Sequence, residues 1–253
     1  MTDAVSVVMA IYNGRRFLTE QVKSVISQLQ PGDELIVVDD ASTDGSAALV
    51  GTFPGVTIVS NDRNVGVLRS FERGLALARH DIVFLCDQDD VWLNGKRSAF
   101  VAEFARDAAI CVVVSDAELI DAKGTVIAGS FMAHRRGFAG NLISTLWRNR
   151  YLGCAMAVRR TLLQIALPFP GFIPMHDMWL GALGSVTGRV VYLSTPYLQY
   201  RRHANNLTPS TSQRPWTQLI LWRLALMLAL VQRLAVVKLG LFRYGARTVR
   251  GSR

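Results

Sequence analysis

Short apolar runs alternate with helix-compatible segments along the first 116 residues. The apolar runs are rich in Val and Ile, and they lie at Val5–Ala10, Glu34–Asp39, Val56–Ser60, Ile82–Cys86 and Ile110–Val114. Between them the spacing of apolar residues predicts helices at Phe17–Leu29, Ser46–Val50, Val67–Arg79 and Lys96–Ala105. This alternation predicts an α/β fold with a Rossmann-like, mostly parallel central sheet flanked by helices, and with ligands at the carboxyl ends of the strands.

Two acidic clusters fall at predicted strand ends. Asp39 and Asp40 end the second strand, and the sequence Asp-Gln-Asp-Asp at 87–90 follows the fourth. Carboxylates this close together raise each other's pKa unless a cation or strong donors compensate, so the second cluster predicts a divalent metal site that would in turn bind phosphate. The first cluster indicates either a contact to a nucleotide or carboxylates that only cap and solvate a turn.

The loop after the first strand lacks the glycine pattern of dinucleotide-binding proteins. It reads Ile11-Tyr12-Asn13-Gly14 instead of Gly-x-Gly-x-x-Gly, which argues against that class of site. Three scattered cysteines also argue against a disulfide framework or a zinc ribbon. Because no secretory signal is visible in the first ten residues, we expect a protein that faces the cytoplasm.

Charge is distributed unevenly along the 253 residues. The formal net charge is +9, yet residues 178–253 contain eleven Lys or Arg and no Asp or Glu, which leaves −2 on residues 1–177. A basic and apolar C-terminal part next to a nearly neutral body favours an anionic membrane surface, and not nucleic acid, as the partner.

The C-terminal part predicts an apolar helix from Pro215 to about Tyr244. Only nine uncharged residues separate Arg223 from Arg233, fewer than the roughly 18–20 that a membrane span needs, so we expect no span. The basic side chains would extend toward lipid headgroups, or the helix would pack on the catalytic domain or a second subunit. We therefore divide the chain into a catalytic domain at 1–208, with halves 1–116 and 117–208, and a tail at 209–253.

Four motifs in order now carry a family resemblance. They are Val5-Ser6-Val7-Val8-Met9-Ala10-Ile11-Tyr12-Asn13, Ile36-Val37-Val38-Asp39-Asp40-Ala41-Ser42-Thr43-Asp44-Gly45, Asn64-Val65-Gly66 and Asp87-Gln88-Asp89-Asp90-Val91-Trp92. Together they resemble the family-2 glycosyltransferases of the GT-A fold. Three later motifs, Gly153-Cys154-Ala155-Met156, His176-Asp177-Met178-Trp179 and Tyr200–Asn206, resemble the rhamnosyltransferase-like branch.

This resemblance implies roles for individual donor-side residues. Asp40, with Tyr12 nearby, would hold the nucleotide base, and Asp87 the ribose or a metal-bound water. Asp89 would bind Mg²⁺ or Mn²⁺, which bridges the two phosphates of the donor. His203 would complete the metal or diphosphate site.

On the acceptor side, the resemblance makes Asp177 the general base of an inverting transfer, with His176 in place of the family's usual first carboxylate. Asp177 would also cap the following helix. Gly153 would let the backbone approach the acceptor, because a small residue leaves room there, or it would belong to a plain buried strand. Trp179 would contact a sugar ring or pack in the core, and its helical spacing with Leu180 and Leu183 favours the core.

The resulting expectation is an inverting, metal-dependent glycosyltransferase. The resemblance implies a nucleotide-diphosphate donor such as dTDP-rhamnose and a lipid-linked saccharide acceptor of bacterial cell-surface polysaccharide synthesis. We expect the enzyme to be peripheral on the inner face of the cell membrane. Two alternatives remain: a haloacid-dehalogenase-like phosphatase, whose motif the sequence around Asp87 and Asp89 also matches, and a non-catalytic sugar-binding relic of the fold.

Overall fold

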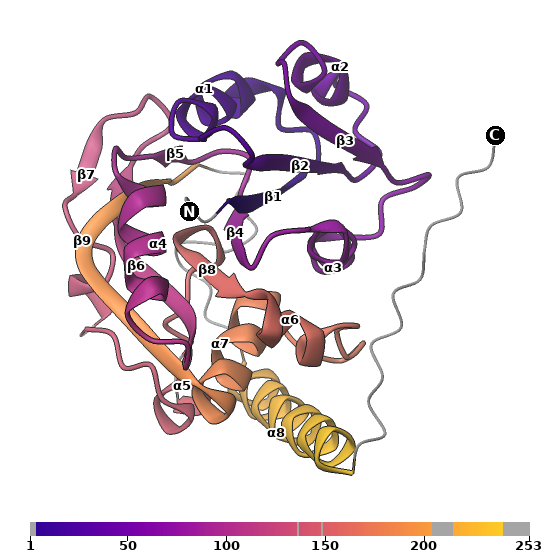
Figure 1. Cartoon of the computed structure of the whole chain (residues 1–253), viewed down its shortest axis with the longest axis vertical. Helices are drawn as coiled ribbons and strands as arrows, with labels where there is room; N and C mark the ends of the chain where they lie inside the picture. Colours follow the sequence, from indigo (N-terminus) through magenta and orange to yellow (C-terminus); the bar gives the residue numbers. More distant parts are fainter. Residues whose placement is uncertain (1–3, 136, 148, 204–214, 240–253) are drawn as a thin grey trace.

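The structure is a computed structural model and describes residues 4–135, 137–147, 149–203 and 215–239. In these residues one central sheet lies between two sets of helices (Figure 1). The strands are β1 (Val5–Ile11), β2 (Glu34–Asp39), β3 (Val56–Ser60), β4 (Ile82–Cys86), β5 (Val91–Trp92), β6 (Ile110–Ile120), β7 (Val126–Ala128), β8 (Met156–Arg159) and β9 (Arg189–Arg201).

The sheet has a parallel half and a mixed half. Its strand order is β3-β2-β1-β4-β8-β6-β9-β5, and β7 pairs with β6. The first four strands of this order are parallel to one another. Beyond them β8 is antiparallel to both neighbours, and β9 is parallel to β6 but antiparallel to β5. The predicted α/β architecture with flanking helices is confirmed.

Helices cover both faces of the sheet, and alternate strand residues pack against each set. Val7 and Phe84 point to the face covered by α1, α2 and α4, whereas Val8 and Leu85 point to the face covered by α3, α6, α7 and α8. The helices are α1 (Arg15–Ile26), α2 (Ser46–Val50), α3 (Val67–Leu77), α4 (Lys96–Arg106), η1 (Ala133–Arg135), α5 (Leu142–Trp147), η2 (Gly153–Ala155), α6 (Arg160–Ala166), α7 (His176–Thr187) and α8 (Trp216–Lys238).

Several predicted boundaries differ from the structure, and two of the differences matter here. α1 ends at Ile26 and not at Leu29, since the N–H groups of Gln28 and Leu29 donate to carbonyls three residues back and close the helix with a tighter turn. β6 continues to Ile120, past the predicted end at Val114, so the predicted division at residue 116 falls inside a strand. Asp116 hides this continuation in the sequence. It is buried in the strand, where its carboxylate accepts the backbone N–H groups of Ala117 and Met132.

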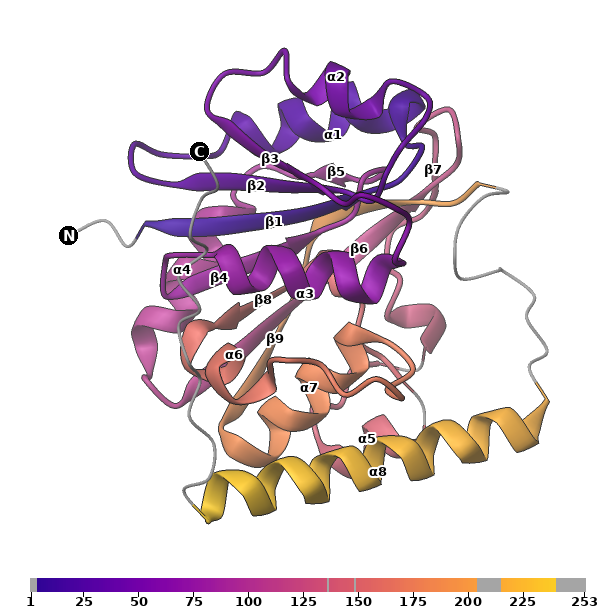
Figure 2. The same cartoon turned by 90° about the vertical axis from the view of Figure 1, so that its right-hand side faces the viewer.

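α8 lies along the flank of the domain beside α5, α6 and α7 (Figure 2). Its inner face buries Leu226, Ala229 and Leu230. Arg223 donates to the carbonyls of Leu146 and Trp147 at the end of α5, and Arg233 donates to those of Ile165, Leu167 and Pro168 at and after the end of α6. The expected extension of these two arginines toward headgroups is therefore wrong: they cap the free carbonyls of two helices.

The length and composition of α8 would also allow it to cross a membrane. It has 23 residues, and an 18-residue window within it has a mean hydropathy of 1.9, a result that the spacing of charges in the sequence did not predict. A single helix of this kind is weak evidence for a span. The packing of one face on the domain instead places α8 parallel to the protein surface. The predicted start of the tail at residue 209 lies outside the described residues.

Candidate active site

A pocket of about 480 Å³ opens at the carboxyl ends of β1, β2 and β4. The sequence predicted most of its important side chains. Seven predicted site residues line it: Tyr12, Asp40, Asp87, Asp89, Gly153, His176 and Asp177. They come from five separate segments of the chain, and parallel strands bring the first four to one edge of the sheet.

Tyr12 is held at the rim of the pocket by its backbone. Its N–H donates to Oε1 of Gln88 at 2.8 Å, and Nε2 of Gln88 donates back to the Tyr12 carbonyl at 3.2 Å. Gly14 makes room for this contact, because a Cβ there would lie 2.3 Å from Oε1 of Gln88. The Tyr12 side chain is left 47% exposed, which suits a surface on which a base can stack.

Asp40 orders the loop between β3 and α3. Oδ1 accepts Nδ2–H of Asn61 at 2.8 Å and the N–H of Val65 at 2.9 Å, and Oδ2 accepts the N–H of Gly66 at 2.8 Å. These bonds use three of the roughly four acceptor positions of a carboxylate. Asp40 therefore fixes the wall of the pocket and keeps one position for a ligand, whereas Asp39 accepts the N–H of Ser42 and so fits the turn interpretation.

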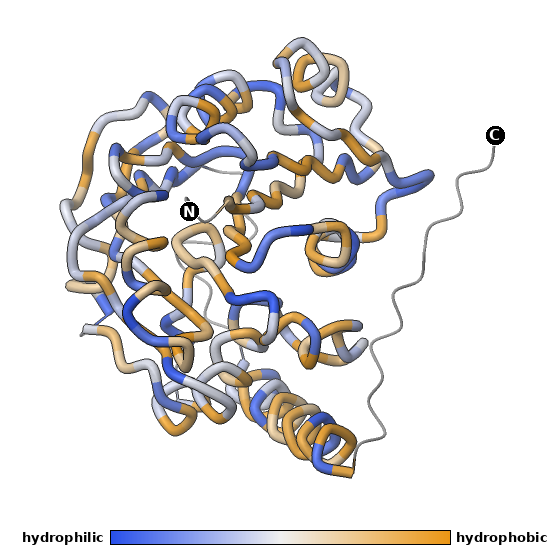
Figure 3. The backbone as a smooth tube through the Cα atoms, in the orientation of Figure 1, coloured by the Kyte–Doolittle hydropathy of each residue, from blue (hydrophilic) through white to orange (hydrophobic). Residues whose placement is uncertain are grey.

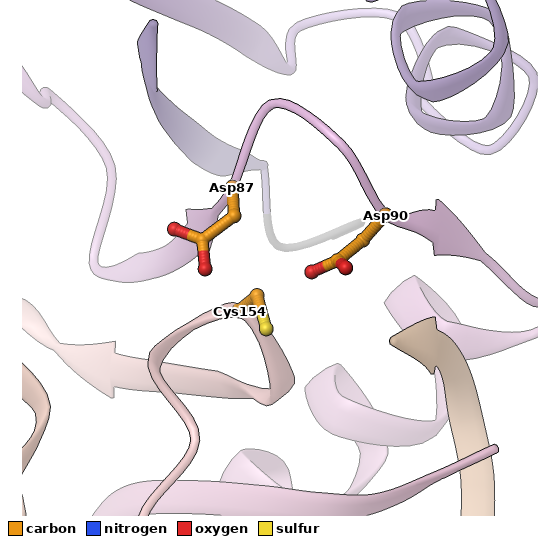
Figure 4. Close-up of side chains that lie close together, drawn as sticks. All are labelled: Asp87, Asp90 and Cys154. Carbon is orange, nitrogen blue, oxygen red and sulfur yellow. The ribbon is translucent and has the colours of Figure 1, made fainter. Parts of the chain in front are cut away.

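The loop after β4 places two carboxyl groups and a thiol close together. Ligand atoms of Asp87, Asp90 and Cys154 all lie within 4.8 Å of one another, and Figure 4 shows the three side chains pointing toward one another. Burial, and next the charge of Asp89, raises the pKa of Asp87 to about 7. The same two causes raise the pKa of the fully buried Asp90 well above its usual value.

A buried ammonium group balances part of this charge. Nζ of Lys96 donates to the carbonyl of Cys154 at 2.6 Å and lies 4.4 Å from the ring centroid of Trp92. Burial lowers the pKa of Lys96 to about 8, so the side chain remains largely protonated at neutral pH. Trp92 itself is buried at 3% exposure and packs behind the loop.

Asp89 and His203 meet at the mouth of the pocket. Nε2 of His203 lies 2.8 Å from Oδ2 of Asp89, and the His203 ring stacks on Phe17 with centroids 4.9 Å apart. Both side chains remain partly accessible, at 12% and 15%. The structure thus brings together the two residues that the resemblance assigned to the metal.

Arg201 holds the acidic loop at residues 87–90 in place. Its backbone N–H donates to Oδ1 of Asp90 at 3.0 Å, and its Nε donates to the carbonyl of Asp89 at 2.8 Å. The guanidinium group also donates to Glu20 at 2.6 Å and lies over the ring of Phe17. The end of β9 therefore holds both the loop and, two residues later, His203 in place.

Asp177 lies in the first turn of α7 on the opposite side of the pocket. Oδ1 accepts the N–H of Met178 at 2.5 Å, and Nδ2 of Asn149 lies 3.4 Å from both carboxylate oxygens. Burial raises the pKa of Asp177 to about 6. At neutral pH the group is thus ionised yet more basic than an exposed carboxylate, as a general base should be.

His176 has two buried ring nitrogens without a protein partner among the described residues. Both Nδ1 and Nε2 lack a hydrogen bond, and burial lowers the pKa of the ring to about 3, so the imidazole is neutral. The ring packs on Phe71 with centroids 4.2 Å apart. Gly153 permits this arrangement, because a Cβ there would lie 2.8 Å from Nε2 of His176. Buried polar atoms without partners suit a site that a ligand completes.

Trp179 takes the core role of its two predicted alternatives. It is completely buried, and its Nε1–H donates to the carbonyl of Ala166 at 3.1 Å. Arg233 of α8 lies over its ring. The suggested contact of Trp179 with a sugar is therefore wrong, because no part of the side chain reaches the pocket.

The family model "Glycosyl transferase family 2" matches residues 6–165, which include the loops after β1, β2 and β4. The chain belongs to this family. Membership of this family excludes the alternative that the chain is a haloacid-dehalogenase-like phosphatase.

Curated relatives of the glycosyltransferase act in several bacteria. Glycosyltransferase GlyG of Streptococcus pneumoniae is 30% identical over 36% of this chain, and the match spans only 32% of GlyG. The dTDP-rhamnosyl transferase RfbG of Shigella flexneri is 23% identical over 78% of this chain and 72% of its own length. The Escherichia coli glucosyltransferase WfgD, named for a GlcNAc-diphosphoundecaprenol acceptor, is 25% identical over 71% and 69%.

Solved structures share the fold of the glycosyltransferase. Staphylococcus aureus TarS in complex with UDP-GlcNAc has a TM-score of 0.67 and 20% identity, over 88% of this chain and 65% of that chain. The mannosyltransferase PcManGT of Pyrobaculum calidifontis, in complex with GDP-Man and Mn²⁺, has a TM-score of 0.60 and 21% identity, over 92% and 64%. These likenesses show the GT-A fold.

Four residues that build the site of this glycosyltransferase were missed in the sequence: Gln88, Lys96, Asn149 and Arg201. Only Lys96 leaves a signal, since it falls on the same face of its helix as Phe100 and Phe104 and is buried with them. The contacts of the other three join residues that are at least 28 positions apart. Such pairings are set by the tertiary fold.

Proposed function

We propose that this chain is an inverting, metal-dependent glycosyltransferase. It moves a sugar from a nucleotide-diphosphate donor to a lipid-linked saccharide acceptor in bacterial surface-polysaccharide synthesis. The observation that carries the proposal is the position of Asp177 across one pocket from the Asp89–His203 pair. In-line displacement needs a base on the acceptor side and a group that holds the diphosphate on the other.

The pocket suits Mg²⁺ or Mn²⁺ at Asp89 and His203. A hard divalent cation prefers carboxylate oxygen, and imidazole is a common additional ligand. The deeper group of Asp87, Asp90 and Cys154 suits it less, because burial raises the pKa of the Cys154 thiol and keeps it protonated. When bound, the ion would neutralise charge on the departing nucleoside diphosphate.

Residues of the chain itself bind the substrates and accept the proton. Tyr12 and Asp40 bind the base, and Asp87 contacts the ribose or a water next to the ion. Asp177 takes the proton from the acceptor hydroxyl as the new glycosidic bond forms, and Asn149 holds its carboxylate in place. Gly153 and His176 lie beside Asp177, where the acceptor sugar must enter.

The finer identity of the substrates rests on relatives. The rhamnose donor of RfbG and the diphosphoundecaprenol acceptor in the name of WfgD support dTDP-rhamnose and a lipid-linked saccharide for this chain. Both proteins match more than two thirds of their own length.

The outer face of α8 supports a peripheral position on the inner face of the cell membrane. Figure 3 shows the helix as mostly hydrophobic at the edge of the domain. Exposed apolar side chains form one stripe opposite the buried face: Trp216, Ile220, Leu221, Leu224, Met227, Leu228, Val231 and Leu239. Lys238 and the four arginines after residue 240 add positive charge. An apolar stripe flanked by cations is typical of helices that lie in the plane of an anionic membrane.

The experiment is a donor screen with the full chain, a lipid-linked acceptor and either Mg²⁺ or Mn²⁺. Release of nucleoside diphosphate is measured for the wild type, for Asp89→Ala and for Asp62→Ala, which alters an exposed carboxylate outside the pocket. Metal-dependent release that only Asp89→Ala abolishes supports the proposal. The absence of release with every donor would instead favour the sugar-binding relic.

A further inference from the structure

A second hollow, separate from the catalytic pocket, lies between α5 and α8. This α5–α8 groove has a volume of about 870 Å³, within the usual range of about 300–1,000 Å³ for small-molecule sites. Its walls are mainly apolar. The residues that matter here are Ile143, Leu146 and Trp147 on α5, and Trp216, Ile220 and Met227 on α8.

Large apolar side chains in the groove are unusually exposed. Ile143 is 82% exposed, Trp147 80% and Trp216 73%. An exposed apolar patch of this kind usually marks a binding surface. The two walls are also held together, because Arg223 of α8 donates to the carbonyls of Leu146 and Trp147. The groove is therefore formed before any ligand arrives.

One short stretch of chain lines both the groove and the catalytic pocket. Arg150 lines the groove, and Leu152 and Gly153 line the pocket. Between α5 and Arg150, Asn149 donates to the carboxylate of Asp177. One segment of chain thus contributes to the wall of the groove, to the wall of the pocket and to the contact with the proposed base.

Cationic groups lie at this junction. Nη1 of Arg150 donates to the carbonyl of Gly137 at 2.8 Å, while its buried Nε has no partner among the described residues. Arg135 also lies here: its guanidinium donates to the carbonyl of Asn149, and its charge offsets a small part of the rise that burial causes in the pKa of Asp177. Guanidinium groups are well suited to phosphate oxygens.

We propose that the α5–α8 groove binds the hydrocarbon chain of the lipid-linked acceptor, with the diphosphate of the acceptor beside Arg150. This inference rests on the proposed function, since it names where the lipid of that acceptor lies. An apolar channel followed by cations and then by the base matches the order of parts in a prenyl-diphosphate-linked sugar. A second copy of this chain would bury the apolar walls but gives no role to the cations or to the continuity with Asp177.

The test uses farnesyl diphosphate with a photoactivatable diazirine on its last isoprene unit. The full chain is irradiated with this probe and the labelled peptides are mapped. We expect labels in 141–147 and 216–227. Ile220→Gln, inside the groove, should reduce labelling about fivefold because of the lost apolar contact, whereas Leu221→Gln, its equally apolar neighbour outside the groove, should not.

Two further measurements separate the possible failures. Nucleoside diphosphate release with a short-chain, water-soluble acceptor reports on the proposed function without the groove. Normal release together with labels elsewhere, or equal labelling of the two variants, overturns the groove and leaves the function intact. Specific labels without release would keep the groove as a prenyl-diphosphate site and overturn the transferase proposal. A dimer in light scattering whose formation blocks labelling would assign the groove to a second copy and overturn the inference.

Discussion

Nε2 of His203 lies 2.8 Å from Oδ2 of Asp89, although 114 positions separate the two residues in the chain. The contact joins the end of β9 to the loop after β4, and Arg201 fixes both ends of this connection. An imidazole nitrogen and a carboxylate oxygen this close are the pair that we propose as ligands of one divalent cation. The pair explains why a histidine near the end of the catalytic domain belongs to a site formed mainly by the first 90 residues.

We expect His203→Asn to raise the Mn²⁺ concentration needed for half-maximal transfer by roughly tenfold or more, because one of two side-chain ligands is weakened. His80→Asn is the matched control, since His80 lies just before β4 at the opposite edge of the sheet. Titration of nucleoside diphosphate release with Mn²⁺ measures both. Equal metal requirements in the two variants would remove His203 from the metal site.

Asp177→Asn should lose transfer and gain stability. The amide oxygen still accepts the N–H of Met178, but the side chain no longer takes a proton from the acceptor. Donor binding, measured by calorimetry, should remain within about twofold. Because burial raises the pKa of Asp177 to about 6, ionising it at neutral pH costs the folded state roughly 2–3 kcal/mol, which the variant avoids.

The same raised pKa determines a pH dependence. The folded protein holds the Asp177 proton more tightly than the unfolded chain, so this group reduces stability as pH rises from about 4 to about 6. Activity follows the opposite trend, since the base works only when ionised: transfer should rise through pH about 6. A flat pH–rate profile between pH 5 and pH 7, or normal turnover by Asp177→Asn, would show that another group is the base.

Gly153→Ala should impair transfer through His176 and Asp177. A Cβ at this position would lie 2.8 Å from Nε2 of His176 and 3.5 Å from Cβ of Asp177, so the imidazole must move. We expect the turnover number to fall about tenfold or more with little change in donor affinity, because small displacements at a reacting centre are costly. Gly129→Ala, where a Cβ meets nothing within 4 Å, should behave as wild type.

His176→Leu tests the two nitrogens that lack partners in the described part of the chain. Leucine has a similar volume and needs no hydrogen bonds, so the free energy of unfolding in the absence of substrate should rise by about 1 kcal/mol. Transfer should nevertheless fall, because the ring borders the pocket beside Asp177. Denaturant unfolding and acceptor kinetics are the two measurements. A more stable variant with unchanged kinetics would assign His176 to packing alone.

The stripe on α8 predicts binding to anionic vesicles. Leu224→Glu with Leu228→Glu places two charges in the exposed stripe without touching the buried Leu226, Ala229 and Leu230. Flotation with vesicles of phosphatidylglycerol and phosphatidylethanolamine should fall about tenfold or more for this double variant. Gln232→Glu, next to the stripe, adds one charge and should reduce flotation only slightly. Full flotation of the double variant would exclude the stripe as the membrane contact.

Much of the fold could be predicted because the strands of its parallel half are short and rich in Val, Ile and Leu. Glu34–Asp39, Val56–Ser60 and Ile82–Cys86 are such runs between turns, and they form strands at those positions. The mixed half was hidden. β6 contains the buried Asp116, and β9 pairs with β6 through several shifts in register, so neither shows a simple apolar period.

The candidate site likewise contains residues that the sequence predicts and residues that it does not. Residues that follow strands, such as Asp40 and Asp89, were predictable from their place alone. Most residues that support them were not, since Arg201 contacts Asp90 across 111 positions and Gln88 contacts Tyr12 across 76. The contacts of Arg233 could not be predicted either, because the sequence of α8 does not show which carbonyls of α6 lie near it without a partner.

The capping of α5 and α6 by Arg223 and Arg233 has a mechanical consequence. Hydrogen bonds attach α8 to the catalytic domain at two points about three turns apart, so the helix is fixed relative to the domain. Any surface on which α8 rests is therefore held at a constant height and tilt relative to Asp177. A fixed distance between that surface and Asp177 would select acceptors by length. Only an acceptor whose hydroxyl group projects this far from the surface would reach Asp177.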